Sequence, residues 1–153
     1  MTSPKEGQKA PDFELKDAEN RTFRLSDFKG RKVVLYFYPK DLTPGCTIEA
    51  CEFRDASEAI KKKGAAVLGV SADSPELHRK FAKKYKLNFP LLSDPEKKVC
   101  RLYGVWRKKS FMGKSFMGIR RTTFLINEQG RIAKIWTDVK PKGHAREILA
   151  ELG

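Results

Sequence analysis

Short apolar runs alternate with amphipathic stretches along most of the chain. The apolar runs are rich in β-branched and aromatic residues, which favours strands, and they cover 13–15, 22–25, 33–38, 65–72, 91–92, 122–127 and 132–136. Apolar residues recur at helical spacing in 48–63, 75–85, 97–103 and 144–152. Strands that alternate with helices predict an α/β fold whose sheet has parallel strands and helices on both sides.

Three local patterns refine this prediction. The run from Val33 to Tyr38 is apolar at every position, which is typical of a central strand that is covered on both faces. Ser74-Pro75-Glu76 predicts a helix start, with a cap, a first-turn proline and an acid. Asn127-Glu128-Gln129-Gly130 predicts the turn of a terminal hairpin, which adds antiparallel strands. We see no domain boundary, and we expect one domain over 1–153.

The charge of the chain is strongly basic, with a formal net charge of +13. The lysines and arginines are dispersed, and most fall on helix faces opposite apolar positions such as Leu77, Phe81 and Tyr85. We therefore expect solvated faces with nonspecific, salt-sensitive attraction to polyanions, and no specific nucleic-acid partner. No zinc-ligand spacing, Walker loop or dinucleotide fingerprint is present in the sequence.

The expected location is the cytoplasm. No apolar run approaches the roughly 20 residues that span a membrane, so we expect no membrane partner. The stretch 1–7 lacks the apolar core of a signal peptide. The three cysteines are an odd number and do not form a disulfide framework. In a reducing compartment, a working cysteine pair is more often catalytic than structural.

Cys46 stands where a helix is expected to begin. Pro39 ends the central strand, Thr43 is a good N-cap, and Pro44 is a favoured first helical residue. Cys46 is then the third helical residue, where free backbone N–H groups and the positive end of the helix dipole favour an anion. The thiolate is such an anion, and it is the reactive form of cysteine.

Cys51 follows Cys46 by five residues. In an intact helix this spacing separates the two Cα atoms by roughly 8.6 Å, whereas a disulfide requires about 4.4–6.8 Å. The two cysteines can pair only if the first turns of the helix unwind. The spacing is unsuited to a structural disulfide and suited to a switch, and it differs from the Cys-x-x-Cys of thioredoxin-type dithiols.

These residues carry a family resemblance. The block Pro39-x-x-x-Thr43-x-x-Cys46 resembles the active-site signature of peroxiredoxins, and the longer run YFYPKDLTPGCTIEACEFRD is similar to their Q-type branch, also called bacterioferritin comigratory protein. The resemblance spans most of the chain. Supporting blocks are GQKAPDF at 7–13, GVSADS at 69–74, FPLLSD at 89–94, YGVW at 103–106 and GIRRTTFLI at 118–126.

The resemblance implies a thioredoxin-like fold, with a central mixed sheet flanked by helices and an N-terminal β extension, and a thiol peroxidase activity. Cys46 would be the peroxidatic cysteine, and Thr43 would hydrogen-bond its sulfur and the peroxide. Pro39 would shield the sulfenic acid from water, and Cys51 would resolve it. No cofactor and no metal is needed, because sulfur performs the chemistry.

The family also supplies an arginine from a distant strand. Strand alternation places Arg120 and Arg121 on opposite faces and cannot choose between them. The position just before Thr-x-Phe-Leu-Ile in the family pattern matches Arg121. Arg120 is expected to be a solvated surface charge.

The implied partners are a hydroperoxide and a dithiol reductant. Hydrogen peroxide or an organic hydroperoxide would oxidise Cys46 to a sulfenic acid, and Cys51 would convert it to a disulfide. Thioredoxin or a similar protein would reduce that disulfide by exchange. A monomer is expected, with a dimer as the alternative.

Two other functions stay open at this point. One is a thiol-disulfide oxidoreductase acting on protein disulfides, against which the Cys-x4-Cys spacing argues. The other is a non-enzymatic, basic, redox-responsive binding protein, against which the dispersed lysines argue. An insulin-reduction assay separates the first alternative from a peroxidase.

Four further features receive structural interpretations. His78 and His144 lie on expected helices and are interpreted as surface residues. Cys100 is interpreted as a partly buried filler of a short helix. The repeat of Lys109-Ser110-Phe111-Met112-Gly113 at 114–118 is expected to be a surface loop, with an apolar flap near the cleft as the alternative.

Overall fold

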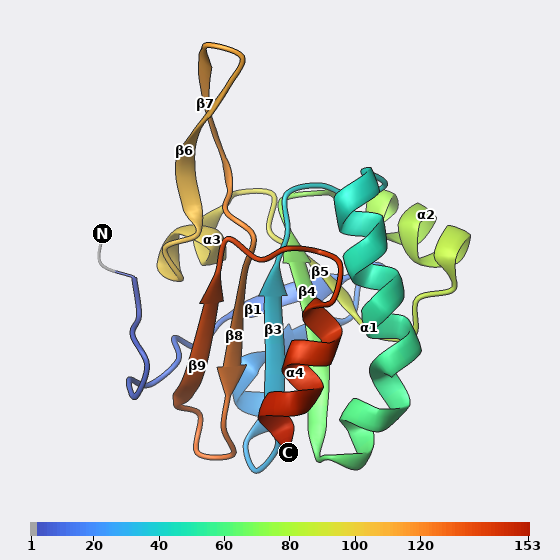
Figure 1. Ribbon diagram of the computed structural model, residues 1–153, viewed down its shortest axis with the longest axis vertical. Helices are drawn as coiled ribbons and strands as arrows, with labels where there is room; N and C mark the ends of the chain where they lie inside the picture. Colours follow the sequence, from blue (N-terminus) through green and yellow to red (C-terminus); the bar gives the residue numbers. More distant parts are fainter. Residues whose placement is uncertain (1–2) are drawn as a thin grey trace.

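The computed structural model describes residues 3–153. The first two residues of the stretch 1–7, which was expected to lack a signal peptide, lie outside the described residues. Figure 1 shows the elements in chain order. The first half contains β1 (Glu14–Asp17), β2 (Thr22–Arg24), η1 (Leu25–Phe28), β3 (Lys32–Phe37), α1 (Pro44–Lys62), β4 (Ala65–Ser71) and α2 (Pro75–Tyr85). The second half contains β5 (Leu91–Ser93), α3 (Lys98–Leu102), β6 (Trp106–Phe111), β7 (Lys114–Ile119), β8 (Thr122–Ile126), β9 (Ile132–Thr137) and α4 (His144–Leu152).

The main sheet has seven strands in the order β2-β1-β5-β4-β3-β8-β9. β3 pairs in parallel with β4 and antiparallel with β8, so the sheet is mixed. β1 and β2 form an antiparallel pair at one edge, which is the predicted N-terminal extension. β8 and β9 form the predicted hairpin at the other edge. The sheet therefore confirms the expected α/β architecture.

The side chains of β3 alternate between two hydrophobic clusters. Val33, Leu35 and Phe37 point into a cluster that contains Val99 and Cys100 of α3. Val34, Tyr36 and Tyr38, the last just beyond the strand, point into the cluster formed with α1, α2 and α4. Helices α1 and α4 lie side by side on the near face of the sheet in Figure 1. The prediction of a central strand buried on both faces is confirmed.

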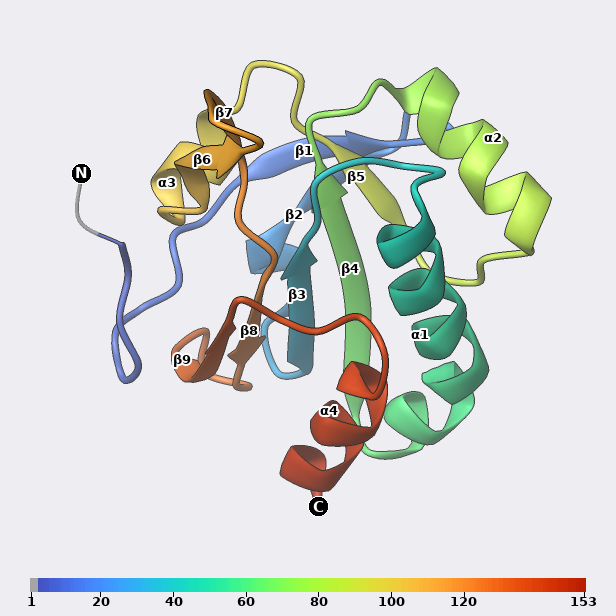
Figure 2. The same ribbon diagram turned by 45° about the horizontal axis from the view of Figure 1, so that its top comes forward.

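The segment that contains the pentapeptide repeat is a β-hairpin, not a loop. β6 and β7 pair antiparallel in a separate two-stranded sheet, with Ser110 opposite Ser115. The hairpin projects from the body at the end where α1 begins (Figures 1 and 2). Phe111 and Met112 near its turn are 67% and 87% exposed. The expected loop is therefore a strand pair with an exposed apolar turn, and an apolar flap near the cleft stays a prediction.

The interpretation of the two histidines as surface residues is wrong. His78 in α2 and His144 at the start of α4 both have 0% relative exposure. His144 Nε2 lies 2.8 Å from Thr123 Oγ1, and its Nδ1 lies 3.0 Å from Glu147 Oε1. Each imidazole is buried because both of its ring nitrogens have polar partners. At least one partner of each comes from a distant part of the chain, Asp41 for His78 and Thr123 for His144, and such partners cannot be predicted from the helical pattern.

The described helices show one further property. Among residues 3–153, no helix is both long enough and apolar enough to cross a membrane.

Candidate active site

The start of α1 carries Cys46 where the sequence predicted it. The helix begins at Pro44, so Cys46 is its third residue, and Thr43 occupies the N-cap position with extended backbone. The Thr43 hydroxyl does not cap the helix; it donates to the carbonyl of Lys40 at 2.8 Å. The backbone N–H groups of the first turn therefore donate no hydrogen bond to this side chain.

The sulfur of Cys46 lies beside a cation. Arg121 Nη2 donates to Cys46 Sγ at 3.3 Å, and Cys46 itself is 1% exposed. Arg121 immediately precedes β8, so the central sheet carries it to the helix start across 75 positions of sequence. A cation and a helix N-terminus next to a cysteine both favour the thiolate.

Glu49 is a member of the site that the sequence analysis missed. Its Oε1 accepts from Arg121 Nη1 at 2.6 Å, and its side chain has 0% exposure. Burial raises the pKa of Glu49 to about 7, against the opposing effect of the Arg121 charge. The available signal was the spacing of three residues after Cys46, because residues at i and i+3 share one face of a helix.

Tyr36 of β3 lies beneath the same helix. Its ring stacks on Phe53 of α1 with centroids 4.7 Å apart. Burial, followed by the negative charges of Glu49 and Cys46, raises the pKa of Tyr36 well above its usual value. Among the described residues, the Tyr36 hydroxyl and Glu49 Oε2 have no hydrogen-bond partner. The wall of the site behind the cysteine thus contains neutral phenol and a carboxyl group.

Gly45 allows the arginine to approach the helix start. A Cβ placed on Gly45 would lie 3.3 Å from Arg121 Nη2 and 3.4 Å from Pro141 Cγ. The first of these is closer than ordinary van der Waals contact, so a side chain here would require the guanidinium to shift by a few tenths of an ångström. Glycine is the residue type that leaves Arg121 in contact with both Cys46 and Glu49.

The two neighbouring arginines have different partners in the structure. Arg120 Nε and Nη2 each lie 2.6 Å from a carboxylate oxygen of Asp138, and the Arg120 side chain is 42% exposed. Arg121 has a side chain that is 15% exposed and contacts the sulfur. Arg121, and not Arg120, therefore lies in the site.

The remaining cysteines are both free thiols. Cys51 is half-buried within the unbroken helix α1, so the helix holds it apart from Cys46 as the spacing predicted. Cys100 has 0% exposure, and burial together with Asp94 raises the pKa of its thiol far above the usual value. Its interpretation as a filler fits this burial, which is complete rather than partial.

Pro39 lies half-buried in the loop between β3 and α1, the loop that also carries Thr43. The structure therefore brings Cys46, Glu49 and Arg121 into contact, with Pro39 and Thr43 in the adjoining loop.

The comparisons with known proteins agree with this geometry. Residues 6–135 match the sequence model of the AhpC/TSA family. Peroxiredoxin Bcp of Bacillus subtilis (strain 168) is 53% identical over 146 residues, which is 95% of this chain and 93% of the relative. The chain belongs to the AhpC/TSA family. Peroxiredoxin Bcp of Escherichia coli (strain K12) is 47% identical over 149 residues, covering 97% of this AhpC/TSA chain and 96% of the relative.

Solved structures extend the likeness. The crystal structure of a Xylella fastidiosa PrxQ mutant has a TM-score of 0.94 and 36% identity, covering 99% of this chain and 97% of that one. A Xanthomonas campestris bacterioferritin comigratory protein, studied for alkyl peroxide reduction, has a TM-score of 0.87 and 39% identity, covering 92% and 89%. The fold of this AhpC/TSA chain is thioredoxin-like, and the chain is a peroxiredoxin and a thiol peroxidase.

One lysine of the β6–β7 hairpin interacts electrostatically with the site of this peroxiredoxin. The aliphatic stem of Lys109 lies against Gly118, where a Cβ would be 3.2 Å from Lys109 Cδ. The pKa of Lys109 is lowered from its usual value, first by burial and then by the charge of Arg121. The negative charges of Cys46 and Asp138 oppose this shift without reversing it. Lys109 is therefore a cation of the hairpin whose charge interacts with Arg121 and Cys46.

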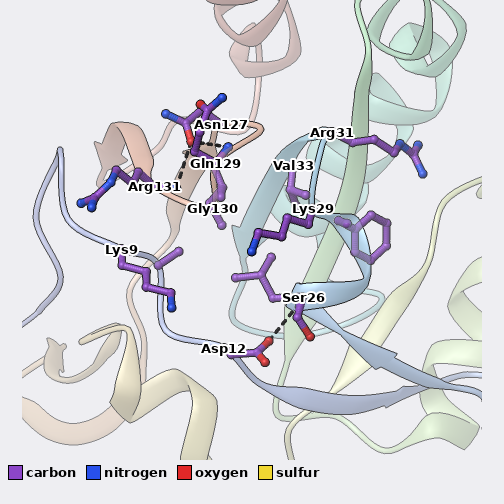
Figure 3. Close-up of a pocket in the computed structure, with 14 residues that line it drawn as sticks. Lys9, Asp12, Ser26, Lys29, Arg31, Val33, Asn127, Gln129, Gly130 and Arg131 are labelled. Carbon is purple, nitrogen blue, oxygen red and sulfur yellow. Dashed lines mark hydrogen bonds between the residues drawn. The ribbon is translucent and has the colours of Figure 1, made fainter.

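A cavity of about 330 Å³ lies elsewhere in this peroxiredoxin, between η1 and the β8–β9 turn. Figure 3 shows Lys9, Lys29 and Asp12 around it. Val33 lines the cavity, whereas the loop that leads to Cys46 follows the other end of the same strand. The six residues of β3 separate the two places by about 20 Å, so this cavity is not part of the peroxidase site.

Proposed function

We propose that Cys46 is the peroxidatic residue and that it reduces hydrogen peroxide and organic hydroperoxides. The observation that carries the proposal is the contact of 3.3 Å between Arg121 Nη2 and Cys46 Sγ at the N-terminus of α1. The site combines a buried sulfur with a fixed positive charge and free backbone N–H groups. This arrangement stabilises both the attacking thiolate and the negative charge that develops on oxygen.

In the first step, the Cys46 thiolate attacks the terminal oxygen of ROOH. A sulfur–oxygen bond forms, the oxygen–oxygen bond breaks, and the sulfur gives two electrons to the peroxide. The leaving alkoxide takes up a proton and departs as ROH, which leaves Cys46 as a sulfenic acid. Arg121 and the first-turn N–H groups stabilise the developing charge on the leaving oxygen.

The loop before α1 supplies the other two proposed residues. We assign to the Thr43 hydroxyl a hydrogen bond to the sulfur and the peroxide, which requires it to turn from the Lys40 carbonyl. We assign to Pro39, half-buried next to that loop, the role of shielding the sulfenic acid from water.

In the second step, Cys51 resolves the sulfenic acid. Its sulfur attacks the Cys46 sulfur, a disulfide forms, and the sulfenic oxygen leaves as water with the thiol proton. Because an intact helix holds the two Cα atoms roughly 8.6 Å apart, beyond the reach of a disulfide, the first turns of α1 unwind for this step. Cys100 is a poor alternative because it is fully buried.

A dithiol protein completes the cycle. We infer that a thioredoxin-like reductant attacks the Cys46–Cys51 disulfide by thiol-disulfide exchange and leaves with the oxidised pair. We also infer a cytoplasmic, monomeric enzyme whose residues 1–153 form one domain. The single seven-stranded sheet, which spans the described residues from β1 to β9, supports the last point.

The test is consumption of hydrogen peroxide with dithiothreitol as reductant. Wild type should turn over, Cys46→Ser should lose turnover entirely, and Cys100→Ser should match wild type. Cys51→Ser should retain a fast first turnover, and dimedone should trap its sulfenic acid. Peroxide consumption by Cys46→Ser at a rate near that of wild type would refute the assignment.

A further inference from the structure

A fully buried carboxylate holds the loop between β3 and α1. Asp41 Oδ1 accepts from the Tyr38 hydroxyl at 2.5 Å, and Asp41 Oδ2 lies 2.5 Å from His78 Nδ1. The side chains of Asp41 and His78 both have 0% exposure. A buried carboxylate is retained only where hydrogen bonds replace its lost hydration, and here they do.

The backbone of Asp41 is tied as well. Its N–H donates to Asp73 Oδ2 at 2.8 Å, and the same oxygen accepts from the Ser71 hydroxyl at 2.8 Å. Asp73 lies between β4 and α2, so this bond joins the loop to the neighbouring crossover of the sheet. Both the side chain and the main chain of Asp41 are therefore fixed.

His78 connects the carboxylate to the sheet. Its Nε2 lies 3.0 Å from the Leu92 carbonyl of β5, and a carbonyl only accepts, so Nε2 carries a proton. Nδ1 is thereby left to share a proton with Asp41. The possible ligand atoms of Asp41, Asp73 and His78 lie within 4.8 Å of one another. Because these groups already pair with protein partners, hydrogen bonds account for the cluster without a cation.

The loop needs such restraint. Leu42, directly after Asp41, has a φ of 66°, in the left-handed region that non-glycine residues seldom adopt. Strained backbone of this kind persists where its surroundings over-determine it. Thr43 follows at the N-cap, and Cys46 follows three residues later. A change in the backbone at Asp41 would therefore move the parts of the site that meet the peroxide.

We propose that Asp41 and His78 are positioning residues for the peroxide reaction, an inference that rests on the proposed function. Their hydrogen bonds hold the loop at 39–43, and with it the backbone of Thr43 at the N-cap, from which its hydroxyl can turn from the Lys40 carbonyl to the sulfur and its substrate. The same bonds anchor the loop while the first turns of α1 unwind, because none of their partners lies in α1. Tyr38 follows β3, Asp73 lies between β4 and α2, and His78 in α2 bonds to Leu92 of β5. The network thus places the hinge of the unwinding at the helix start.

The test compares Asp41→Ala with Asp41→Asn. Asparagine keeps the bonds, because its amide oxygen accepts from Tyr38 and its N–H donates to Nδ1 of neutral His78. Single-turnover reaction with hydrogen peroxide should slow about tenfold or more in Asp41→Ala, since small misplacements of reacting groups have effects of this size. The rate in Asp41→Asn should stay within about twofold of wild type. Alkylation of Cys46 by iodoacetamide, which does not use Thr43, should change less than about twofold in both.

Two tyrosine variants provide a second test that does not depend on whether Asp41→Ala folds. Tyr38→Phe removes one bond of the network, and Tyr103→Phe removes a bond of equal length, 2.5 Å, from a buried tyrosine to the Pro11 carbonyl. Only Tyr38→Phe should slow the peroxide step, by about threefold. Equal rates in the two tyrosine variants, unchanged peroxide kinetics in Asp41→Ala, or parallel losses in peroxide reaction and alkylation would each overturn the inference. Wild type that consumed no peroxide would instead refute the proposed function.

Discussion

At the scale of single residues, the environment of one sulfur determines the chemistry. Cys46 is buried, and the cation that contacts it also contacts a buried carboxylate. Arg121 therefore divides its charge between Cys46 and Glu49. When Glu49 is protonated, the guanidinium of Arg121 interacts electrostatically mainly with the thiolate. When Glu49 is ionised, the guanidinium also forms an ion pair with its carboxylate. Cys46 and Glu49 thus share one cation.

The first prediction concerns the two neighbouring arginines. Arg121→Ala should lower the second-order rate with hydrogen peroxide by about a hundredfold, because it removes charge stabilisation from the transition state. Arg120→Ala is the matched control and should change the rate less than about twofold, because its exposed pair with Asp138 contributes little. Equal losses in the two variants, in stopped-flow measurements, would contradict the assignment.

The second prediction concerns the pH dependence of stability. Burial raises the pKa of Glu49 to about 7 in the folded protein, so the folded state binds this proton more tightly than the unfolded state does. The protonated Glu49 therefore contributes to the free energy of unfolding. This contribution is fully present below a pH of about 4.5 and is lost as the pH rises through about 7. The loss is on the order of 3 kcal/mol from the size of the shift.

Glu49→Gln should remove this dependence. Urea unfolding at several values between pH 5 and pH 8 should show the free energy of wild type falling relative to that of the variant. Glu58→Gln, an exposed substitution on the same helix, should follow wild type across the range. Parallel curves for wild type and Glu49→Gln would show that the carboxyl group is not perturbed in this way.

At the scale of elements, the proposed function makes the start of α1 both the reactive site and the part that moves. Cys46 and Cys51 lie in one continuous helix, so the disulfide and the intact helix exclude each other. The segment is suited to local opening because it lies at a helix terminus, where opening requires least free energy. Gly45 lowers the helix propensity there.

Hydrogen exchange provides the third prediction. Amides within 45–53 should exchange much faster in the disulfide form than in the dithiol form, whereas the amides of β3, β4 and β8 should remain protected in both. Mass spectrometry of the exchanged peptides measures both sets together, so the strands serve as the internal control. Unchanged protection of 45–53 in fully oxidised protein would exclude the unwinding step.

Elements differed in how far the sequence could predict them. Residues 144–152 and 75–85 were predicted with their observed bounds. Helical periodicity indicates both helices, and for 75–85 the cap signal at Ser74-Pro75-Glu76 coincides with it. The β6–β7 hairpin was missed because it buries neither face, which leaves no alternation of apolar residues to detect. Its turn has Met112 and Gly113 at φ values of 52° and 78°, and methionine is not a typical residue for the first of these positions.

At the scale of the whole molecule, the site is assembled from distant parts of the chain. Motif spacing predicted Cys46 and Cys51, but the choice of Arg121 came from the family pattern and not from strand alternation. The buried roles of His78 and His144 could not be predicted, since their partners Asp41 and Thr123 lie 37 and 21 positions away in sequence. Polar contacts of this range depend on the packing of the sheet and not on local pattern.

The most direct test of the account is a peptide map after one equivalent of peroxide. Reduced wild type is treated with hydrogen peroxide, and its free thiols are then alkylated. The masses of the tryptic peptides are measured by mass spectrometry with no reductant added. The peptide 41–54, which holds Cys46 and Cys51, should be lighter by two hydrogen atoms and carry no alkyl group, while Cys100 should be alkylated. A Cys46 that is alkylated as a free thiol, or that is linked to Cys100, would contradict the account.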